Sequence, residues 1–521
     1  MSDYARIRIK VNGRDVRVPE GTTVAAAIAI ADAMPRRSVT GDARGPLCGM
    51  GTCFECRATV DGVPQRRTCQ IPTRAGMEVA TDEGGPLRLD DPGPAVRSPS
   101  ARSFDVLIVG AGPAGMAACV AAASAGLRVG VVDDNPDAGG QIWRGEAEKP
   151  SSREAAAWFG RVRAAKFELL AATQVLGPLG PGFLLADNDD GAVELGYDRL
   201  ILAPGARELF LPFPGWTLPN VMGAGGLQAM VKSGLPVVGK RVVVAGSGPL
   251  LLAVAAYLKT RGADVRVVAE QAPIGRLARF GLGLWREPGK LRQAVGLRAS
   301  MGSIPFRAGS WPVRAEGNGR VEAVVLTDGL KSWREPCDYL ACGFGLVPND
   351  ELPLALGCST TEGGFVAVDD EQRTSVPGVF AAGEVTGVGG LDLSLVEGEM
   401  AGHWAAGVPA KARALAARRE RARRFAVGLG RAFALRDELR ALPESDTIVC
   451  RCEDVPHGRL RREGSWVEAK LQARCGMGPC QGRVCGPAAG VLYGWSRASV
   501  RPPIFPAELG HLAGRAPARP G

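Results

Sequence analysis

The chain has 521 residues, of which 46% are hydrophobic and 22% are charged, with a formal net charge of +9, and this length predicts several domains with ordinary buried cores. No stretch approaches the roughly 18 consecutive apolar residues of a membrane span, and the opening MSDYARIRIK lacks the apolar core of a signal peptide, so a cytoplasmic protein is expected. Aromatic residues, at 6%, do not interleave with the arginines, which argues against nucleic-acid binding and favours a solvated basic surface.

Thirteen cysteines in a chain without a secretion signal indicate metal or redox chemistry rather than disulfides. Four of them lie near the N-terminus and five near the C-terminus. The three histidines are His403, His457 and His511, and none stands beside a serine or cysteine in a nucleophile motif. The composition therefore favours electron transfer over acid–base or triad catalysis.

Residues 1–85 carry the pattern of a small mixed domain. An alternating run, Ile7 to Val11, is followed by Asn12-Gly13, which is a strong hairpin signal, and by a second strand-like run. A helix is predicted next, capped by Thr22 or Thr23. This hairpin and helix resemble the start of a β-grasp ferredoxin.

Four cysteines follow the predicted helix at spacings that suit one iron–sulfur cluster. They read Cys48-x4-Cys53-x2-Cys56, with Cys69 further along the chain. This matches the plant-type [2Fe–2S] spacing, in which one loop donates three thiolates and a later segment donates the fourth. A four-cysteine zinc site stays open as the alternative, although zinc sites favour two C-x2-C pairs and only one is present.

A linker is predicted over 86–103, where prolines are frequent and apolar periodicity is absent. It leads into a strand, a turn with Gly110-x-Gly112-x-x-Gly115, a helix and a second strand. In this fingerprint the first glycine makes the turn, the second lets the backbone approach a pyrophosphate, and the third lets helix and strand pack closely. Asp133, at the end of the second strand, is predicted to accept hydrogen bonds from an adenosine ribose.

Two later strand ends indicate that the dinucleotide is FAD. LILAPG (200–205) and VFAAGE (379–384) resemble paired motifs of flavoproteins with two dinucleotide-binding domains. That resemblance implies that Glu384 hydrogen-bonds the ribityl chain, within an FAD-binding domain predicted over 104–210 and 336–410. The predicted cofactor-binding residues are Gly110, Gly112, Gly115, Asp133, Asp134, Gly140, Gln141, Gly383 and Glu384.

A second strand–helix–strand pattern, Arg241 to Glu270, falls in a predicted inserted domain, 211–335. It keeps Gly246-x-Gly248, but Leu251 replaces the third glycine and is expected to push the helix away from the strand. We therefore expect a retained scaffold domain, with weak binding of an adenine nucleotide and catalytic binding of NAD(P)H both left open. Four scattered cysteines in the central region are expected to be buried hydrophobic residues: Cys119, Cys337, Cys342 and Cys358.

The C-terminal part begins with a basic helix in a connector predicted over 411–443. It is expected to be solvated, with contact to an acidic partner or, peripherally, to the inner membrane left open. A small domain is predicted over 444–498, and a tail that lies loosely on the surface over 499–521.

The five cysteines of this small domain stand in two short runs that indicate a closed four-thiolate site. The predicted ligands are Cys450, Cys452, Cys480 and Cys485, with Cys475 spare. The pattern resembles the small [2Fe–2S] domain of bacterioferritin-associated ferredoxin, although Cys480-x4-Cys485 is wider than that family's usual C-x2-C. Zinc again stays open.

Nearly the whole chain resembles the α or A component of bacterial multi-subunit amine and amino-acid dehydrogenases, such as opine oxidase, hydrogen cyanide synthase and hydroxyproline or proline dehydrogenase. The likeness is carried by VGAGPAG, GGQIWR, VFAAGE, CRCEDV and RCGMGPCQGRVC. The expected fold class is α/β, a Rossmann-like flavoprotein with two dinucleotide-binding domains, an N-terminal β-grasp ferredoxin domain and a small C-terminal helical [2Fe–2S] domain. The chain looks like a fusion of the family's small ferredoxin subunit with its flavoprotein subunit.

The resemblance implies a division of labour and no catalytic residue in this chain. A partner subunit of the D-amino-acid-oxidase type oxidises the substrate at its own FAD, and the present chain passes the electrons through FAD and two [2Fe–2S] clusters to an acceptor. Whether an FMN is shared at the subunit interface stays open. The alternatives are a self-contained NAD(P)H-dependent iron–sulfur flavoprotein reductase and a non-catalytic protein whose cysteines hold zinc.

Overall fold

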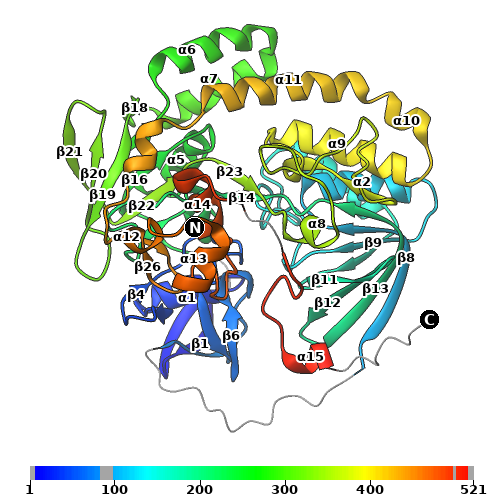
Figure 1. Ribbon diagram of the computed structural model, residues 1–521, viewed down its shortest axis with the longest axis horizontal. Coiled ribbons are helices and arrows are strands. Elements are labelled where there is room, and N and C mark those ends of the chain that lie inside the picture. Colours follow the sequence, from blue (N-terminus) through cyan, green and yellow to red (C-terminus); the bar gives the residue numbers. More distant parts are fainter. Residues whose placement is uncertain (1–5, 83–97, 497–499, 514–521) are drawn as a thin grey trace. The chain divides into compact units, whose positions relative to one another are not determined.

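The computed structural model describes residues 6–82, 98–496 and 500–513 (Figure 1). The chain folds into two compact units, each assembled from separate stretches. Unit 1 consists of Met1–Leu87, Glu208–Leu346 and Leu429–Arg497, and unit 2 consists of Arg88–Arg207, Val347–Gly428 and Ala498–Gly521. Within the described ranges, no helix is long and apolar enough to cross a membrane.

The first part of unit 1 is a five-stranded sheet, in the order β2-β1-β7-β5-β6, that shares one apolar core with helix α1 (Val24–Ile30). Strand β1 pairs antiparallel with β2 and parallel with β7. Asn12 and Gly13 have φ values of 49° and 77° at the β1–β2 turn, the geometry of a tight hairpin. The elements are β1 (Arg6–Val11), β2 (Arg14–Pro19), β3 (Arg36–Arg37), β4 (Ala43–Arg44), β5 (Arg57–Val60), β6 (Val63–Arg67), η1 (Thr68–Gln70) and β7 (Glu78–Ala80).

The second part of unit 1 is a parallel sheet in the order β15-β22-β16-β17-β18, flanked by helices in a Rossmann-like arrangement. The structure differs from the predicted return of the chain to the FAD-binding domain at residue 336, because β22 still pairs with β16. Pairing across the sheet places β22, and no local motif marks it. The elements are β15 (Val221–Met222), α4 (Ala224–Lys232), β16 (Arg241–Gly246), α5 (Leu250–Thr260), β17 (Asp264–Glu270), α6 (Ile274–Gly283), η3 (Leu284–Arg286), α7 (Pro288–Met301), β18 (Phe306–Ala308), β19 (Trp311–Glu316), β20 (Ala323–Thr327), β21 (Ser332–Pro336) and β22 (Tyr339–Gly343). The short strands β14 (Ala206–Glu208) and β23 (Leu346–Pro348) pair with each other at the chain positions where one unit gives way to the other.

The third part of unit 1 is a small, mainly helical fold around the C-terminal cysteines. Ser465 caps α13 by accepting a hydrogen bond from Glu468 N at 3.2 Å. Arg474, with φ 61°, ends α13 in the left-handed conformation and leads the chain into Cys475. The elements are η5 (Asp437–Ala441), β25 (Ile448–Cys450), β26 (Val455–Pro456), α12 (His457–Leu460), α13 (Trp466–Ala473) and α14 (Cys485–Tyr493).

Unit 2 is built on a seven-stranded sheet in the order β10-β9-β8-β13-β12-β11, with β24 also paired to β13. The strands β8, β9, β10, β13 and β24 run parallel, while β11, β12 and β13 form an antiparallel meander. Helices α2 and α9 pack so closely that a Cβ on Gly398 would overlap the backbone of Ala114. The elements are β8 (Ser100–Val109), α2 (Pro113–Ala123), β9 (Val129–Val132), α3 (Arg153–Ala164), β10 (Glu168–Leu170), β11 (Gln174–Gly180), β12 (Phe183–Asn188), β13 (Gly191–Leu202), α8 (Glu351–Ala355), β24 (Val379–Ala381), η4 (Gly383–Val385), α9 (Gly390–Ala405), α10 (Pro409–Arg413), α11 (Ala416–Ala432) and α15 (Leu509–Ala513).

The basic helix predicted as a solvated connector is α11, and part of it is buried. Arg419 is only 5% exposed and lies 3.6 Å from Glu397 of α9, and Arg423 pairs with the same carboxylate at 3.1 Å. Apolar side chains of α11, including Ala422 and Ala426, pack on α9. The prediction of a solvated helix is therefore corrected for Arg419 and Arg423, because their acidic partner lies on another element, whereas Arg418, Glu420 and Arg424 are exposed as predicted.

Two further expectations concern the ends of unit 2. Most of the predicted linker, up to residue 97, lies outside the described residues, and β8 already begins at Ser100 rather than at the predicted boundary of 104. The described part of the predicted loose tail is packed, since Ile504 is 3% exposed in the core and its N–H donates to Leu176 O at 2.8 Å. Residues 514–521 lie outside the described residues.

Candidate functional site

Three strand ends of unit 2 lie side by side at one edge of its sheet. In the parallel register, Val109 of β8 is level with Leu202 of β13, and Leu202 is level with Ala381 of β24. The glycine turn, the LILAPG turn and the VFAAGE turn therefore leave the sheet together. The carboxyl edge of a parallel sheet is where dinucleotides bind in Rossmann-like domains.

The glycine turn leaves open space at Gly112, which is the N-cap residue of α2. A Cβ on Gly112 would have only Gly140 Cα within 4 Å, at 3.8 Å. A Cβ on Gly110 would overlap the Ala203 carbonyl, and one on Gly115 would overlap the Gly110 carbonyl. Two glycines thus serve close packing, while Gly112 keeps room at the helix N-terminus, where unpaired N–H groups favour a phosphate.

The carboxylate of Asp133 is engaged within the protein. One oxygen accepts from Ala111 N at 2.5 Å and the other from Asn135 N at 2.8 Å. Burial, with the neighbouring charge of Asp134, raises the pKa of Asp133 to about 6. Asp133 therefore fixes the glycine turn, a role that the sequence did not show. The ribose contact of Asp133 and the cofactor contact of Asp134 stay predictions.

The loop after β9 lies against the glycine turn. Gly139 N donates to Ala111 O at 2.9 Å, and a Cβ on Gly140 would approach Gly112 Cα to 2.9 Å. Gln141 follows in the same loop and is half-buried. The predicted residues Gly140 and Gln141 thus stand beside the open space at Gly112.

Glu384 follows β24 and carries an unpaired buried oxygen. Its Oε1 accepts from Gly390 N at 2.8 Å, whereas its Oε2 has no hydrogen-bond partner among the described residues. Burial raises the pKa of Glu384 to about 7. A Cβ on Gly383 would lie 2.7 Å from Ala114 Cβ, so this turn contacts the first turn of α2. An orphaned buried acceptor in the turn next to the start of α2 fits FAD, whose hydroxyl groups would supply the missing donors.

The four N-terminal cysteines form two touching pairs in unit 1, and all are at most 4% exposed. The thiol of Cys53 is hydrogen-bonded to the sulfur of Cys48, and the thiol of Cys69 is hydrogen-bonded to the sulfur of Cys56. Burial raises the pKa of Cys48, but hydrogen bonds from Cys53, Thr52 and backbone N–H groups outweigh it and bring the pKa down to about 5. The backbone N–H groups of Met50 and Cys53 lie 3.4 Å from the Cys48 sulfur. Four buried thiols with backbone donors fit a thiolate-bound cluster.

The five C-terminal cysteines are also buried and gathered in unit 1. The sulfurs of Cys450, Cys475 and Cys485 all lie within 4.8 Å of one another. The thiols of Cys452 and Cys480 are free and hydrogen-bonded to each other. Cys475, which was expected from the sequence to be spare, thus stands beside two of the predicted ligands. The fold brings it there, because the three sulfurs come from the end of β25, the turn after α13 and the start of α14.

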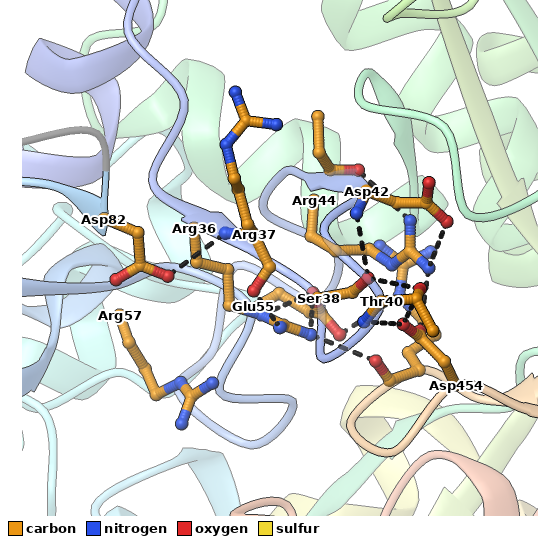
Figure 2. Close-up of polar contacts among 12 residues, drawn as sticks. Arg36, Arg37, Ser38, Thr40, Asp42, Arg44, Glu55, Arg57, Asp82 and Asp454 are labelled. Carbon is orange, nitrogen blue, oxygen red and sulfur yellow. Dashed lines mark hydrogen bonds and ion pairs between the residues drawn. The ribbon is translucent and has the colours of Figure 1, made fainter.

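Charged and polar residues that were not among the predicted site residues join the two cysteine-bearing loops of unit 1. Figure 2 shows Arg36 and Glu55 on one side of this contact and Arg44 and Thr40 around Asp454 on the other. Glu55 and Arg451 are separated by 396 positions in the chain. Arg451 lies in the CRCEDV motif and Glu55 lies between two predicted ligands, but neither motif indicates that the two residues meet.

The second glycine turn, in the parallel sheet of unit 1, is bonded to the chain itself. Ser247 Oγ donates to Phe433 O at 3.1 Å, Gln271 Nε2 donates to Ser247 Oγ at 2.9 Å, and Arg436 N donates to Gln271 Oε1 at 3.2 Å. Leu251, at 1% exposure, belongs to the apolar core. The polar groups next to this turn therefore already have partners in the segment 433–436.

Two family descriptions match the chain. Residues 104–401 match "Pyridine nucleotide-disulphide oxidoreductase", and residues 4–84 match "2Fe-2S iron-sulfur cluster binding domain". The HcnB component of hydrogen cyanide synthase from Pseudomonas aeruginosa is 31% identical over 423 residues, which cover 73% of this chain and 90% of that protein. The A component of opine oxidase from Rhizobium meliloti (strain 1021) is 31% identical over 467 residues, which cover 79% and 98%.

One solved structure is similar along nearly the whole chain. The crystal structure of L-proline dehydrogenase from P. horikoshii matches with a TM-score of 0.71 over 98% of both chains, at 20% identity. At this identity the likeness concerns the fold. Together with the family matches, it confirms the predicted α/β fold class, with an FAD-binding domain and an N-terminal [2Fe–2S] domain.

Proposed function

Because the chain belongs to the pyridine nucleotide-disulphide oxidoreductase family, among the FAD- and [2Fe–2S]-containing subunits of multi-subunit dehydrogenases, we propose that it transfers electrons within a heteromeric amine or amino-acid dehydrogenase. It receives electrons from a partner subunit's flavin and hands them to an acceptor. The observation that carries the proposal is that one chain combines an FAD cradle with two buried groups of thiols. FAD exchanges one or two electrons, and each cluster exchanges one.

The residues of this chain hold and tune the cofactors in this proposal. Gly112 leaves the space for the pyrophosphate, and Glu384 offers its unpaired oxygen to the ribityl chain. Cys48, Cys53, Cys56 and Cys69 are the proposed ligands of the first cluster. The second cluster is proposed to be bound by four of the five C-terminal thiols, and Cys475 is a candidate ligand beside the four predicted ones.

The substrate class follows from the relatives. One relative is named an opine oxidase and another a hydrogen cyanide synthase, so a CH–NH or CH–NH2 group of an opine, proline, hydroxyproline, glycine or sarcosine is the proposed site of oxidation. The proposed partner is an FAD subunit of the D-amino-acid-oxidase type. An FMN shared with that partner, and an adenine nucleotide in unit 1, are further ligands to seek by extraction.

The second candidate function, a self-contained NAD(P)H-dependent reductase, needs a working nicotinamide site at Gly246–Gly248. Ser247 and Gln271 there are bonded to Phe433 and Arg436, and Glu270 accepts from Gly248 N at 2.8 Å. A dinucleotide has to displace these bonds before it approaches the turn. This favours the relay function over the reductase.

The test compares the purified chain alone with the chain co-expressed with its oxidase-like partner. Alone, it is expected not to oxidise proline, hydroxyproline, sarcosine, glycine or opines with a dye acceptor, and to reduce dyes poorly with NADH. With the partner, amine-dependent dye reduction is expected. Anaerobic bleaching of the flavin by NADH in the isolated chain, at a rate that matches turnover, overturns the relay in favour of the reductase.

A further inference from the structure

A buried ion pair connects the two cysteine-bearing loops of unit 1. Glu55 stands between Cys53 and Cys56, and Arg451 stands between Cys450 and Cys452. Arg451 Nε donates to Glu55 Oε1 at 3.1 Å, and both side chains are 1% exposed. The two loops that carry the proposed ligands therefore touch through one carboxylate and one guanidinium.

Arg36 binds to both Glu55 and the Arg451 backbone, so that the three residues form a triad. Its Nε donates to Glu55 Oε2 at 3.2 Å (Figure 2). Its Nη2 donates to Arg451 O at 3.1 Å. Its side chain is 3% exposed. Each oxygen of Glu55 thus accepts from a different arginine, and Arg36 reaches both the side chain of one loop and the backbone of the other.

A second tie holds the same two segments without lying between the cysteines. Asp454 accepts from Thr40 Oγ1 at 2.6 Å, from Thr40 N at 3.1 Å and from Arg44 Nη2 at 2.8 Å (Figure 2). Because this tie already joins the segments, the triad is not the sole means of docking. Its position between the ligands calls for a separate explanation.

The triad is poorly explained by stability alone. A buried ion pair loses much of its Coulomb energy to desolvation, and apolar replacements of such pairs are often neutral. Two positive charges and one negative charge leave the triad with a net charge of +1 in a buried position. Arg451 donates through Nη1 to Trp216 O at 3.0 Å, but its buried Nη2 has no partner among the described residues.

The charges of the pair lie next to cysteines of both groups. Glu55 is adjacent to Cys56 and two residues from Cys53, and Arg451 is adjacent to both Cys450 and Cys452. A charge between two sites that each become more negative on reduction affects both of them, because charge interactions in a low-dielectric interior reach beyond direct contact. The unpaired Nη2 of Arg451 is a donor suited to a sulfur acceptor, since hydrogen bonds to sulfur tune iron–sulfur sites.

We propose that Arg36, Glu55 and Arg451 form a shared positioning element that sets the reduction potentials of both cluster sites and holds the two ligand loops together. The inference rests on the proposed relay function, because it requires a cluster in each cysteine group. The step that it serves is the passage of one electron from the reduced site to the oxidised site. One site is oxidised and the other reduced, and no bond forms or breaks.

The charge of the triad predicts the sign of every substitution. Glu55→Gln changes its net charge from +1 to +2 and is expected to raise both potentials. Arg451→Gln changes it to 0 and is expected to lower both. The double variant returns it to +1, so both potentials are expected to move back toward those of the unmodified protein. Thr40→Val removes one of the three contacts to Asp454 in the neighbouring tie without changing a charge, and it serves as the matched control.

The experiment is a potentiometric titration of the full chain followed by electron paramagnetic resonance, with iron content and thermal unfolding measured on each variant. Each single charge change is expected to shift the one-electron equilibrium of both sites about tenfold, which is about 59 mV. A purely structural triad predicts the double variant to be at least as perturbed as either single variant. Return of the potentials in the double variant distinguishes the two roles.

Several results overturn the inference. A shift at one site only, shifts of the same sign in Glu55→Gln and Arg451→Gln, or an equal shift in Thr40→Val each contradict it. If Glu55→Gln fails to fold, Arg451→Gln and the double variant still carry different expectations, namely lowered potentials for the first and nearly unmodified potentials for the second. If both clusters are present and their potentials do not change in the charge variants, this inference is refuted alone. If the protein holds no second cluster, the proposed relay function is refuted as well.

Discussion

Substitution of Gly112 by valine tests whether the open space at the start of α2 holds a pyrophosphate. Gly112 has φ −71° and ψ −176°, a conformation that valine also adopts, and only Gly140 Cα lies within 4 Å of an added Cβ. The protein therefore accommodates the side chain. The expected cost to folding is that of a poorer N-cap residue, about 1 kcal/mol or less.

The cost to FAD binding is expected to be larger, because the valine methyl groups fill the space that the pyrophosphate needs. Hydrogen bonds to charged groups contribute about 1.5–3 kcal/mol each, so the loss of two from the helix start costs ~3–6 kcal/mol. At about 1.4 kcal/mol for each factor of ten, the affinity for FAD falls about 10²- to 10⁴-fold. Such a protein loses FAD on desalting.

The assay measures FAD by absorbance and iron by chemical analysis after desalting. Gly160→Val, in α3 of the same unit, is the matched control, since a Cβ there has no atom within 4 Å. We expect Gly112→Val to lose FAD and keep its iron, and the control to keep both. Stoichiometric FAD in Gly112→Val refutes the assignment of this space, and joint loss of FAD and iron refutes the claim that valine fits the fold.

Three further predictions concern unit 1. Cys53→Ser is expected to lower the iron content from about four to about two per chain and to spare the other cluster's spectroscopic signal, so loss of both signals contradicts independent sites. Cys475→Ser is expected to lower the amount of C-terminal cluster bound per chain, because this thiol lies beside two proposed ligands. If the variant keeps the full amount of this cluster, Cys475 is not a ligand. Glu208 accepts hydrogen bonds from Gly225 N and Gly226 N at 3.0 Å each, and burial raises its pKa from 4.5 to about 7. As the pH rises, the carboxyl group loses its proton in the unfolded chain before it does so in the folded chain. The free energy of unfolding is therefore expected to fall by up to ~3 kcal/mol as the pH rises from about 4.5 to 7. Glu208→Gln is expected to flatten this fall, measured by urea unfolding at pH 5 and pH 8, and an unchanged fall would assign it to other groups.

Sequence alone determined the parts of this protein whose geometry depends on neighbours along the chain. The spacing of Gly110, Gly112 and Gly115 predicted a tight turn, a free approach and a close packing, because a strand, a turn and a helix follow one another there. The spacing of Cys48, Cys53 and Cys56 predicted a ligand loop for the same reason. From such motifs the fold class and the main cofactors followed.

Tertiary structure decided what depends on residues far apart in the chain. Partners from other elements decide three features: the place of β22 in the sheet of β16, the ion pair of buried Arg419 with Glu397, and the position of Cys475 among the thiols. The contact of Glu55 with Arg451 is of the same kind. A charged residue in a sequence gives no sign of its partner, because burial and charge pairing arise only when distant segments exclude water together.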